Sequence, residues 1–186
     1  MTSGLHSRLF RPGLVVATLL MLVSLSGTAV AAPFGAGSFG DDAPFGDTTS
    51  LAIALGGDVD LGLTLSGGTL SGTGSTGVTV TSNAAEGYGL YMYADGSSDM
   101  VSGSSLIPAS TNGSNAPLSA NTWGYNTTGS STDFLGLSTL PTLIKQGTGP
   151  HTTGETTTVT FGVKADATQA AGDYSVSVVY TAVALN

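Results

Sequence analysis

Residues 172–186 read GDYSVSVVYTAVALN, and large or apolar side chains alternate with mostly small polar ones along this stretch. One set takes every second position: Tyr174, Val176, Val178, Tyr180, Ala182 and Ala184. Successive side chains of a β-strand point to opposite faces, so this period of two predicts a strand with one face in a core. A strand of this length belongs inside a sheet, because its backbone groups need hydrogen-bond partners.

The same alternation recurs in five earlier segments, at 49–57, 58–68, 77–83, 88–95 and 156–165. Thr and Val favour pleated strands, and the 28 glycines of the chain suit turns and bulges. No segment after residue 48 has a helical period, and residues 97–149 carry only weak strand signals. Short alternating strands separated by Gly- and Ser-rich turns predict an all-β fold, an antiparallel β-sandwich.

The first 31 residues have the pattern of a secretory signal peptide. Arg8 and Arg11 precede an apolar run at 14–30, which ends in the Ala-Val-Ala of 29–31. A retained membrane anchor is the competing interpretation, but the run is short against the roughly 20 apolar residues that a spanning helix needs. We therefore expect cleavage before Ala32 and an exported product, secreted or held at the cell surface or cell wall, without a membrane span.

Residues 32–48 read APFGAGSFGDDAPFGDT, and Gly, Pro and Asp dominate them. This composition predicts a short flexible leader before a sandwich domain at 49–186. An alternative is that Phe34, Phe39 and Phe45 dock on another subunit. Their spacing does not match the period of two that a donated strand requires.

The charge balance excludes some partners. Without the signal peptide the chain has only Lys145 and Lys164 against 12 acids, a side-chain charge of −10. Nucleic-acid binding requires clustered Lys and Arg, and anionic membranes attract the same residues, so neither is an expected partner. The chain has no Cys, so its stability must come from packing and backbone pairing.

Three segments resemble a known group of proteins. TSNAAEGYGLYM (81–92), SANTWGYN (119–126) and TTTVTFGVKADATQAAGDYSVSVVYTA (156–182) are similar to secreted bacterial surface domains with immunoglobulin-like sandwiches. The likeness extends distantly to WxL cell-wall-binding domains. This chain departs from the latter, because Trp123 is followed by Gly-Tyr and Tyr180 stands where their second Trp motif falls. The resemblance implies an immunoglobulin-like sandwich in an exported bacterial envelope or surface protein.

Trp123 and Tyr125 are the candidate ligand-binding residues. Together they would form an aromatic platform for a sugar ring. The alternative is that the aromatic residue caps the core beneath a loop and uses its indole N–H for one local hydrogen bond.

Other residues are predicted to shape the fold: Asn83, Gly87, Tyr88, Asn121, Gly124, Gly172 and Tyr174. Gly87 would supply an unusual backbone geometry at a turn that leads into a strand. Gly124 would permit a bend, and Asn121 would bond to nearby backbone. Tyr174, which follows Gly172-Asp173, would tie a corner through its hydroxyl, as tyrosine corners do in sandwiches.

Two carboxylate pairs, Asp58 with Asp60 and Asp95 with Asp99, are the candidate metal ligands. Calcium prefers several such oxygens held by a turn, although neither segment has a full twelve-residue calcium loop. The alternative is that these are solvated turn acids. No other cofactor is expected.

No pattern predicts catalysis. His151 lies in GPHTTGE, which reads as an exposed turn, and no G-x-S-x-G motif accompanies it. Glu86 and Glu155 are the only glutamates, and nothing in the sequence places them as a catalytic pair. The sequons at Asn112 and Asn126 are interpreted as chance matches in a Ser- and Thr-rich chain.

The leading hypothesis is an exported, non-catalytic envelope or surface protein with a structural or adhesive role. One alternative is a carbohydrate- or peptidoglycan-binding module that uses Trp123 and Tyr125. Another is a pilin-like subunit that assembles by strand exchange. The expected partners are cell-wall glycan, other envelope proteins or further copies of the chain.

Overall fold

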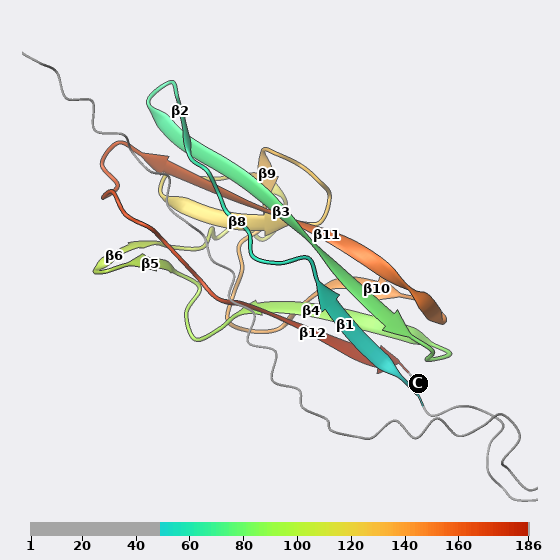
Figure 1. Ribbon diagram of the computed structural model, residues 1–186. Coiled ribbons are helices and arrows are strands. Elements are labelled where there is room, and N and C mark those ends of the chain that lie inside the picture. Colours follow the sequence, from blue (N-terminus) through green and yellow to red (C-terminus); the bar gives the residue numbers. More distant parts are fainter. Residues whose placement is uncertain (1–48, 186) are drawn as a thin grey trace, which may run out of the picture.

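The computed structural model describes residues 49–185, and the regular elements of this range are all β-strands, paired antiparallel (Figure 1). The predicted all-β antiparallel fold is thereby confirmed, and it is compatible with an immunoglobulin-like sandwich. The predicted signal peptide at 1–31 and leader at 32–48 lie outside the described residues, as does Asn186. No helix in the described range is long and apolar enough to cross a bilayer.

The strands are β1 (Leu51–Leu55), β2 (Thr64–Ser66), β3 (Thr69–Ser82), β4 (Gly87–Ala94), β5 (Met100–Ser102), β6 (Ser105–Ile107), β7 (Ala116–Pro117), β8 (Thr122–Asn126), β9 (Asp133–Phe134), β10 (Thr142–Gly147), β11 (His151–Asp166) and β12 (Val178–Leu185). The larger sheet has the order β1-β3-β11-β8, with β2 also paired to β3. The smaller sheet has the order β10-β4-β12, and β5–β6 and β7–β9 are two-stranded ribbons.

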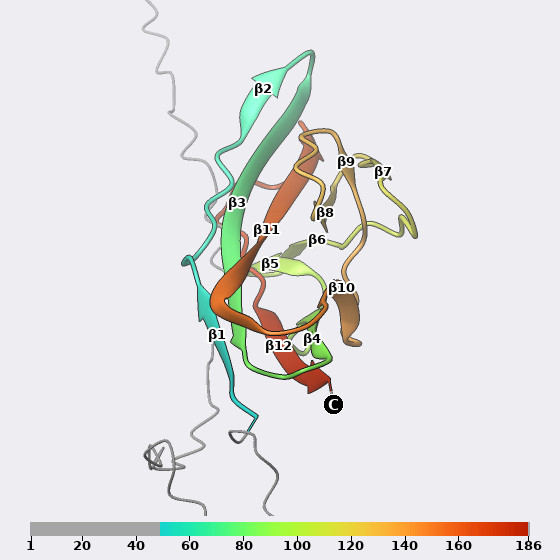
Figure 2. The same cartoon turned by 90° about the vertical axis from the view of Figure 1, so that its right-hand side faces the viewer.

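The pairing of β3 with β11 spans the molecule. Its register runs from Thr69 opposite Asp166 to Val80 opposite Glu155, and it shifts between His151 and Glu155. Figure 2 shows these two strands as a long twisted wall, with the smaller sheet packed against one end of it. The remaining length of the wall is covered by the short ribbons and loops.

The core lies between the two sheets and consists of the alternating side chains. The larger sheet contributes Val78, Val80, Val159, Phe161 and Val163, and the smaller sheet contributes Tyr88, Leu90, Met92 and Val178. In the terminal segment Tyr174 and Val176 are buried, while Tyr180, Ala182 and Ala184 are half-buried. The predicted inward face is therefore correct, although continuous pairing with β4 begins only at Val178.

The segment 58–68 differs from its prediction, because only Thr64–Ser66 form a strand. Val59 and Leu61 are nevertheless buried, with 3% and 1% of their surface exposed. A side chain at Gly74 of β3 would lie 2.7 Å from Val59 Cγ1, so the missing side chain lets this segment cross β3 closely. The alternation reports burial here, but the segment packs across the sheet instead of pairing within it.

The face of the larger sheet opposite the core is covered largely by hydroxyl groups. The hydroxyls of Ser75 and Thr160 are 3.2 Å apart, and those of Thr79 and Thr156 are 2.7 Å apart. Each pair joins β3 to β11, so the two strands are linked by side chains as well as by backbone. These neutral contacts replace the ion pairs that a more charged chain would place on such a surface.

Tyr174 forms the expected corner before β12. Its hydroxyl donates a hydrogen bond of 2.8 Å to the carbonyl of Ala170 and accepts one of 2.7 Å from Gln169 Nε2. A bond from the hydroxyl back to upstream backbone is the geometry of a tyrosine corner in sandwich folds. Gly172 lies within this corner, close to Ser102.

The turn between β3 and β4 is built from the predicted residues. Asn83 Oδ1 accepts a 2.6 Å bond from the N–H of Ser50, and the N–H of Asn83 donates to the Ser50 carbonyl at 3.2 Å. These bonds tie the start of the described chain to the end of β3. β4 then begins at Gly87, which has a φ of +101°, and Tyr88 follows with its side chain fully buried.

The roles expected for Gly124 and Asn121 need correction. Gly124 does not bend the chain but lies inside β8, where an added Cβ would be 2.3 Å from the Leu135 carbonyl oxygen. The unusual backbone belongs to Asn121, with a φ of +58°. Its side chain bonds to distant backbone, because Oδ1 accepts a 2.9 Å bond from the N–H of Asp166.

Replacing Gly87 by alanine should destabilise the fold more than replacing Gly57. Both have positive φ, at +101° and +112°, so both substitutions introduce backbone strain of roughly 1–3 kcal/mol. A Cβ at Gly87 would also lie 2.1 Å from the Gly147 carbonyl oxygen, whereas one at Gly57 meets nothing within 4 Å. Urea unfolding of G87A and G57A measures the difference. Equal losses of unfolding free energy would contradict this packing of the β3–β4 turn against β10.

Candidate functional site

Trp123 and Tyr125 face the core. They lie opposite Val163 and Phe161 in the β8–β11 register, and only 1% and 3% of their surfaces are exposed. The Trp123 indole N–H donates a 2.8 Å bond to the Ser98 carbonyl, and burial raises the pKa of Tyr125. Neither ring is available to stack on a sugar. The aromatic-platform prediction is therefore wrong, and the core-capping alternative describes Trp123.

The four candidate metal ligands remain two separate pairs. Asp58, Asp60 and Asp95 are exposed, and Asp99 is half-buried. Residues 49–185 contain no group of three or more His, Cys, Asp or Glu side chains placed to hold a metal ion. Because calcium takes six to eight oxygen ligands, the calcium prediction finds no support in this part of the chain.

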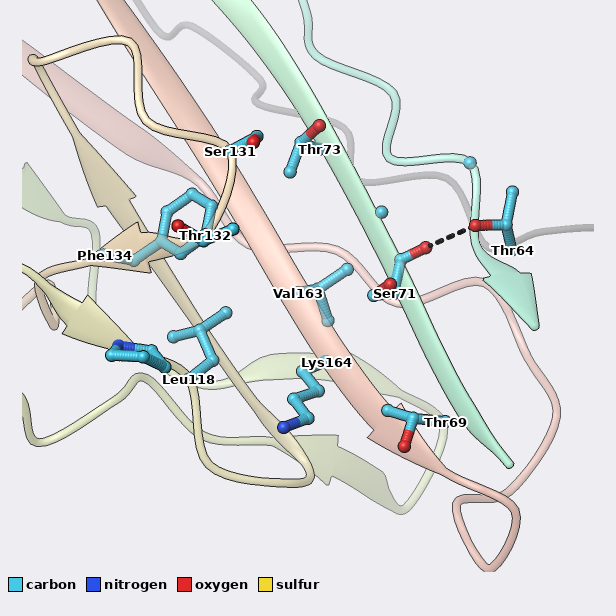
Figure 3. Close-up of a pocket in the computed structure, with 13 residues that line it drawn as sticks. Thr64, Thr69, Ser71, Thr73, Leu118, Ser131, Thr132, Phe134, Val163 and Lys164 are labelled. Atoms are coloured by element: carbon cyan, nitrogen blue, oxygen red, sulfur yellow. Dashed lines mark hydrogen bonds between the residues drawn. The ribbon is translucent and has the colours of Figure 1, made fainter. Parts of the chain in front are cut away.

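A groove on the outward face of the larger sheet is the strongest candidate binding site (Figure 3). Its volume is about 660 Å³. We call it the hydroxyl groove and define it by its lining residues: Gly62, Thr64, Thr69, Ser71, Gly72, Thr73, Pro117, Leu118, Ser131, Thr132, Phe134, Val163 and Lys164. The set combines Ser and Thr hydroxyls, one cation and a few apolar side chains.

The floor of the groove follows from the period of β3. Thr69, Ser71 and Thr73 occupy alternate positions of this strand, so they share its outward face at a spacing of about 7 Å. Lys164 of β11 lies opposite Ser71 in the register, and its side chain extends away from β3, toward the side of the groove where Leu118 lies (Figure 3). On the adjacent strand β2, Thr64 is the register partner of Ser71, and its hydroxyl donates a 3.2 Å bond to the Ser71 carbonyl.

One wall of the groove is held by Asn126, whose side chain is fully buried. Its Nδ2 donates bonds of 2.9 Å and 3.0 Å to the carbonyls of Ser130 and Asp133, and its Oδ1 accepts from the N–H groups of Thr128 and Ser130 at 3.2 Å. These bonds fold the loop that carries Ser131 and Thr132. The Thr128 hydroxyl also donates to Oδ1 at 3.3 Å, so every one of these partners belongs to the segment that follows Asn126 and fixes this wall locally.

Asn112 fixes the neighbouring wall. Its Nδ2 donates to the carbonyls of Ala116 and Phe134 at 3.0 Å and to that of Pro117 at 3.3 Å. Asn112 and Asn126 thus both use the side-chain amide that a sequon would offer for glycosylation. The sequence contains a signal for this role that the predictions do not use, since Asn followed by small polar residues is typical of side-chain-to-backbone turns.

The apolar part of the groove comes from β9 and the segment before β8. The Phe134 ring lies over Gly162 of β11, where any side chain would overlap it, and only 3% of its surface is exposed. Leu118 is 6% exposed and lies beside it (Figure 3). These side chains give the hydroxyl row a rigid apolar border.

Lys164 is the one cation of the groove, and it makes no ion pair with any residue between 49 and 185. Asp166, on the same face of β11, is already bonded. Its carboxylate accepts from the Thr168 hydroxyl at 2.5 Å, from the Thr168 N–H at 2.8 Å and from Asn121 Nδ2 at 3.1 Å. These bonds, led by the Thr168 hydroxyl, hold the pKa of Asp166 below its ordinary value. Lys164 therefore remains available to an anionic group.

A second polar cluster joins the two sheets at the other end of β11. We call Tyr88, Lys145, His151 and Glu155 the inter-sheet cluster. Glu155 Oε1 is 2.7 Å from Lys145 Nζ, and Oε2 accepts a 2.8 Å bond from the Tyr88 hydroxyl and lies 3.4 Å from His151 Nε2. The Tyr88 and His151 rings meet edge to face at 5.3 Å. His151 is half-buried at the start of β11, which corrects its expected place in an exposed turn.

The contacts within the inter-sheet cluster shift the pKa values of Glu155 and Tyr88 in opposite directions. Hydrogen bonds from Lys145 and Tyr88 hold the pKa of Glu155 below its ordinary value. Burial, followed by the bond to Glu155, raises the pKa of Tyr88. Both oxygens of Glu155 are thus engaged by side chains of the protein, so the cluster acts as a tie between β4, β10 and β11.

Comparison of the chain with protein-family models, curated proteins and solved structures finds no match.

The inter-sheet cluster should make stability depend on pH in the acid range. Because the pKa of Glu155 is lower in the folded state, its contribution is complete above the unfolded value of about 4.5 and is lost as the pH falls through the folded value. Urea unfolding of the wild type and of E155Q over this range should show a steeper acid loss in the wild type. E86Q is the control, because Glu86 is exposed and outside the cluster. Parallel curves for wild type and E155Q would disprove the tie.

Asn126→Ala should loosen the wall of the hydroxyl groove. The substitution removes the hydrogen bonds between a fully buried side chain and partly buried loop carbonyls and N–H groups, at a cost of about 1–3 kcal/mol in unfolding free energy. Amide hydrogen exchange at Thr128 and Ser130 should quicken selectively. Asn115→Ala is the control, because Asn115 is exposed in the neighbouring loop. If N126A and N115A were equally stable, the buried amide would not hold the loop.

Proposed function

We propose that this protein is an exported, non-catalytic bacterial envelope or surface protein with an adhesive role, and that the hydroxyl groove is its contact surface for a hydroxyl-rich polymer such as cell-wall glycan. The observation that carries the adhesive role is the groove itself, which is open and rigidly walled. Export is supported by the signal pattern at 1–31, and the envelope setting by the resemblance to bacterial surface domains.

The lining chemistry of the groove favours a glycan. Ser and Thr hydroxyls both donate and accept hydrogen bonds, as sugar hydroxyls do, so the row of Thr69, Ser71 and Thr73 can pair with a sugar in several ways. A repeating row on a strand also suits a linear polymer, which presents hydroxyls at intervals along its length.

Lys164 adds a preference within this class. An unpaired amine in the same groove as the hydroxyls favours a glycan that carries carboxylate or another anionic group. The side-chain charge of −10 would repel such a polymer at long range. We therefore expect modest affinity for such a polymer.

The groove also replaces Trp123 and Tyr125 in the carbohydrate-binding alternative, since those rings belong to the core. A non-catalytic role is favoured by the inter-sheet cluster, the one place where Tyr, Lys, His and Glu side chains meet within residues 49–185. A general base needs an oxygen free to take a proton from a substrate, whereas both Glu155 oxygens contact internal partners.

Binding to purified cell-wall polysaccharide tests the proposed function. Ser71→Trp fills the floor of the groove and should weaken binding at least about tenfold, or about 1.4 kcal/mol. Thr158→Trp is the matched control, because Thr158 is also an exposed hydroxyl on the larger sheet but lies outside the groove. Lys164→Gln should selectively weaken binding to carboxylated glycans. Wild-type protein that binds no glycan, or that loses binding equally in S71W and T158W, would overturn the proposal.

A further inference from the structure

The edges of the two sheets differ in how they are protected. β8 is covered, because the N–H of Ser110 bonds to the Trp123 carbonyl at 2.7 Å and Tyr125 exchanges bonds with Leu135 at 2.7 and 2.9 Å. β10 has a bulge between Leu143 and Lys145 and carries the charge of Lys145. Bulges, charges and coverage are the devices by which natural proteins prevent pairing between sheet edges.

The remaining edges of the larger sheet are short. β2 has three residues and β1 has five, and Gly56 and Gly57 follow β1 directly. Short edge strands offer few backbone groups to a partner, so they too limit pairing.

β12 is not short and has no bulge and no charge, although β1 of the larger sheet lies next to it. β12 has eight residues, VVYTAVAL, without Gly, Pro or charge, and it pairs with β4 from Val178 to Leu185 without a register shift. The N–H of Asp95 bonds to the Ser177 carbonyl at 3.0 Å, so odd-numbered residues face β4. By the alternation of an antiparallel ladder, the even-numbered residues turn their N–H and C=O groups away from β4: Val178, Tyr180, Ala182 and Ala184. No backbone partner for these groups lies within residues 49–185.

We propose that β12 pairs antiparallel with β12 of a second copy of this chain. The two smaller sheets then form one continuous sheet with the order β10-β4-β12-β12-β4-β10. The axis of the pair is twofold, so each copy gives the same edge to the other. Such an interface closes at two copies and leaves no further β12 edge, which distinguishes it from a filament of pilin-like subunits.

Charge does not oppose self-association at this edge. Copies with a side-chain charge of −10 repel one another, and the repulsion is smallest where charges are absent. β4 and β12 contain no charged residue. The strand is also compatible with itself, because antiparallel self-pairing opposes only small, apolar or hydroxyl side chains. On the outer face Val179 and Val183 would continue the strip that Tyr91 and Tyr93 begin on β4.

Lysine substitutions at two matched positions test the proposal. Val183 on β12 and Leu143 on β10 are both 46% exposed and lie on the outer face of the smaller sheet, but on opposite edges. Sedimentation equilibrium of the purified wild type should show a concentration-dependent dimer. Val183→Lys should raise the dimer dissociation constant at least about tenfold, because edge lysines oppose strand pairing. Leu143→Lys should leave it unchanged.

Single cysteines give a second readout, because the chain has no native Cys. Val179→Cys, Thr181→Cys and Val183→Cys sample the outer face of β12, and at least one should form a disulfide-linked dimer under mild oxidation. Leu143→Cys should not. A wild type that stays monomeric at every concentration overturns the proposal. This holds even if the cause is that residues 32–48 cover β12 of their own chain. Equal increases of the dimer dissociation constant in V183K and L143K also overturn it. That result would indicate that the copies associate through the outer faces of their smaller sheets and not through the β12 edge.

Discussion

The antiparallel ladder between β3 and β11 is the constraint on which the other elements depend. β1 and β2 pair with β3, and β8 pairs with β11, so the larger sheet is assembled around these two strands. Their alternate positions also serve both faces, with Val78 and Phe161 in the core and Ser71 and Lys164 in the hydroxyl groove. A shift of one residue would exchange the two faces. One register therefore fixes the core and the groove together.

β11 is anchored near both of its ends by a carboxylate. Near its start, Glu155 reaches across to Tyr88 and Lys145 of the smaller sheet. At its end, Asp166 is bonded by Asn121, which precedes β8. The two anchors have different consequences. The first joins the sheets across the core, whereas the second secures the end of the sheet beside Lys164, where the groove needs a fixed floor.

The sequence allowed the fold to be predicted where one face of a strand is apolar, as in residues 156–165 and 172–186. It misled at 58–68, because alternation reports which side chains are buried and not whether the backbone pairs. It left Trp123 undecided, since periodicity does not reveal what covers a face. The groove could not be predicted at all. Its walls are positioned by bonds from Asn112 and Asn126 to loop carbonyls, including that of Phe134, 22 residues from Asn112.

The hydroxyl pairs between β3 and β11 affect how the protein responds to its surroundings. Ser75 with Thr160, and Thr79 with Thr156, stay uncharged across the ordinary range of acidity. Dissolved ions screen interactions between charges but have little hold on neutral contacts such as these. This part of the larger sheet thus keeps one pattern of donors and acceptors from low to high ionic strength, so its surface chemistry is insensitive to dissolved salt.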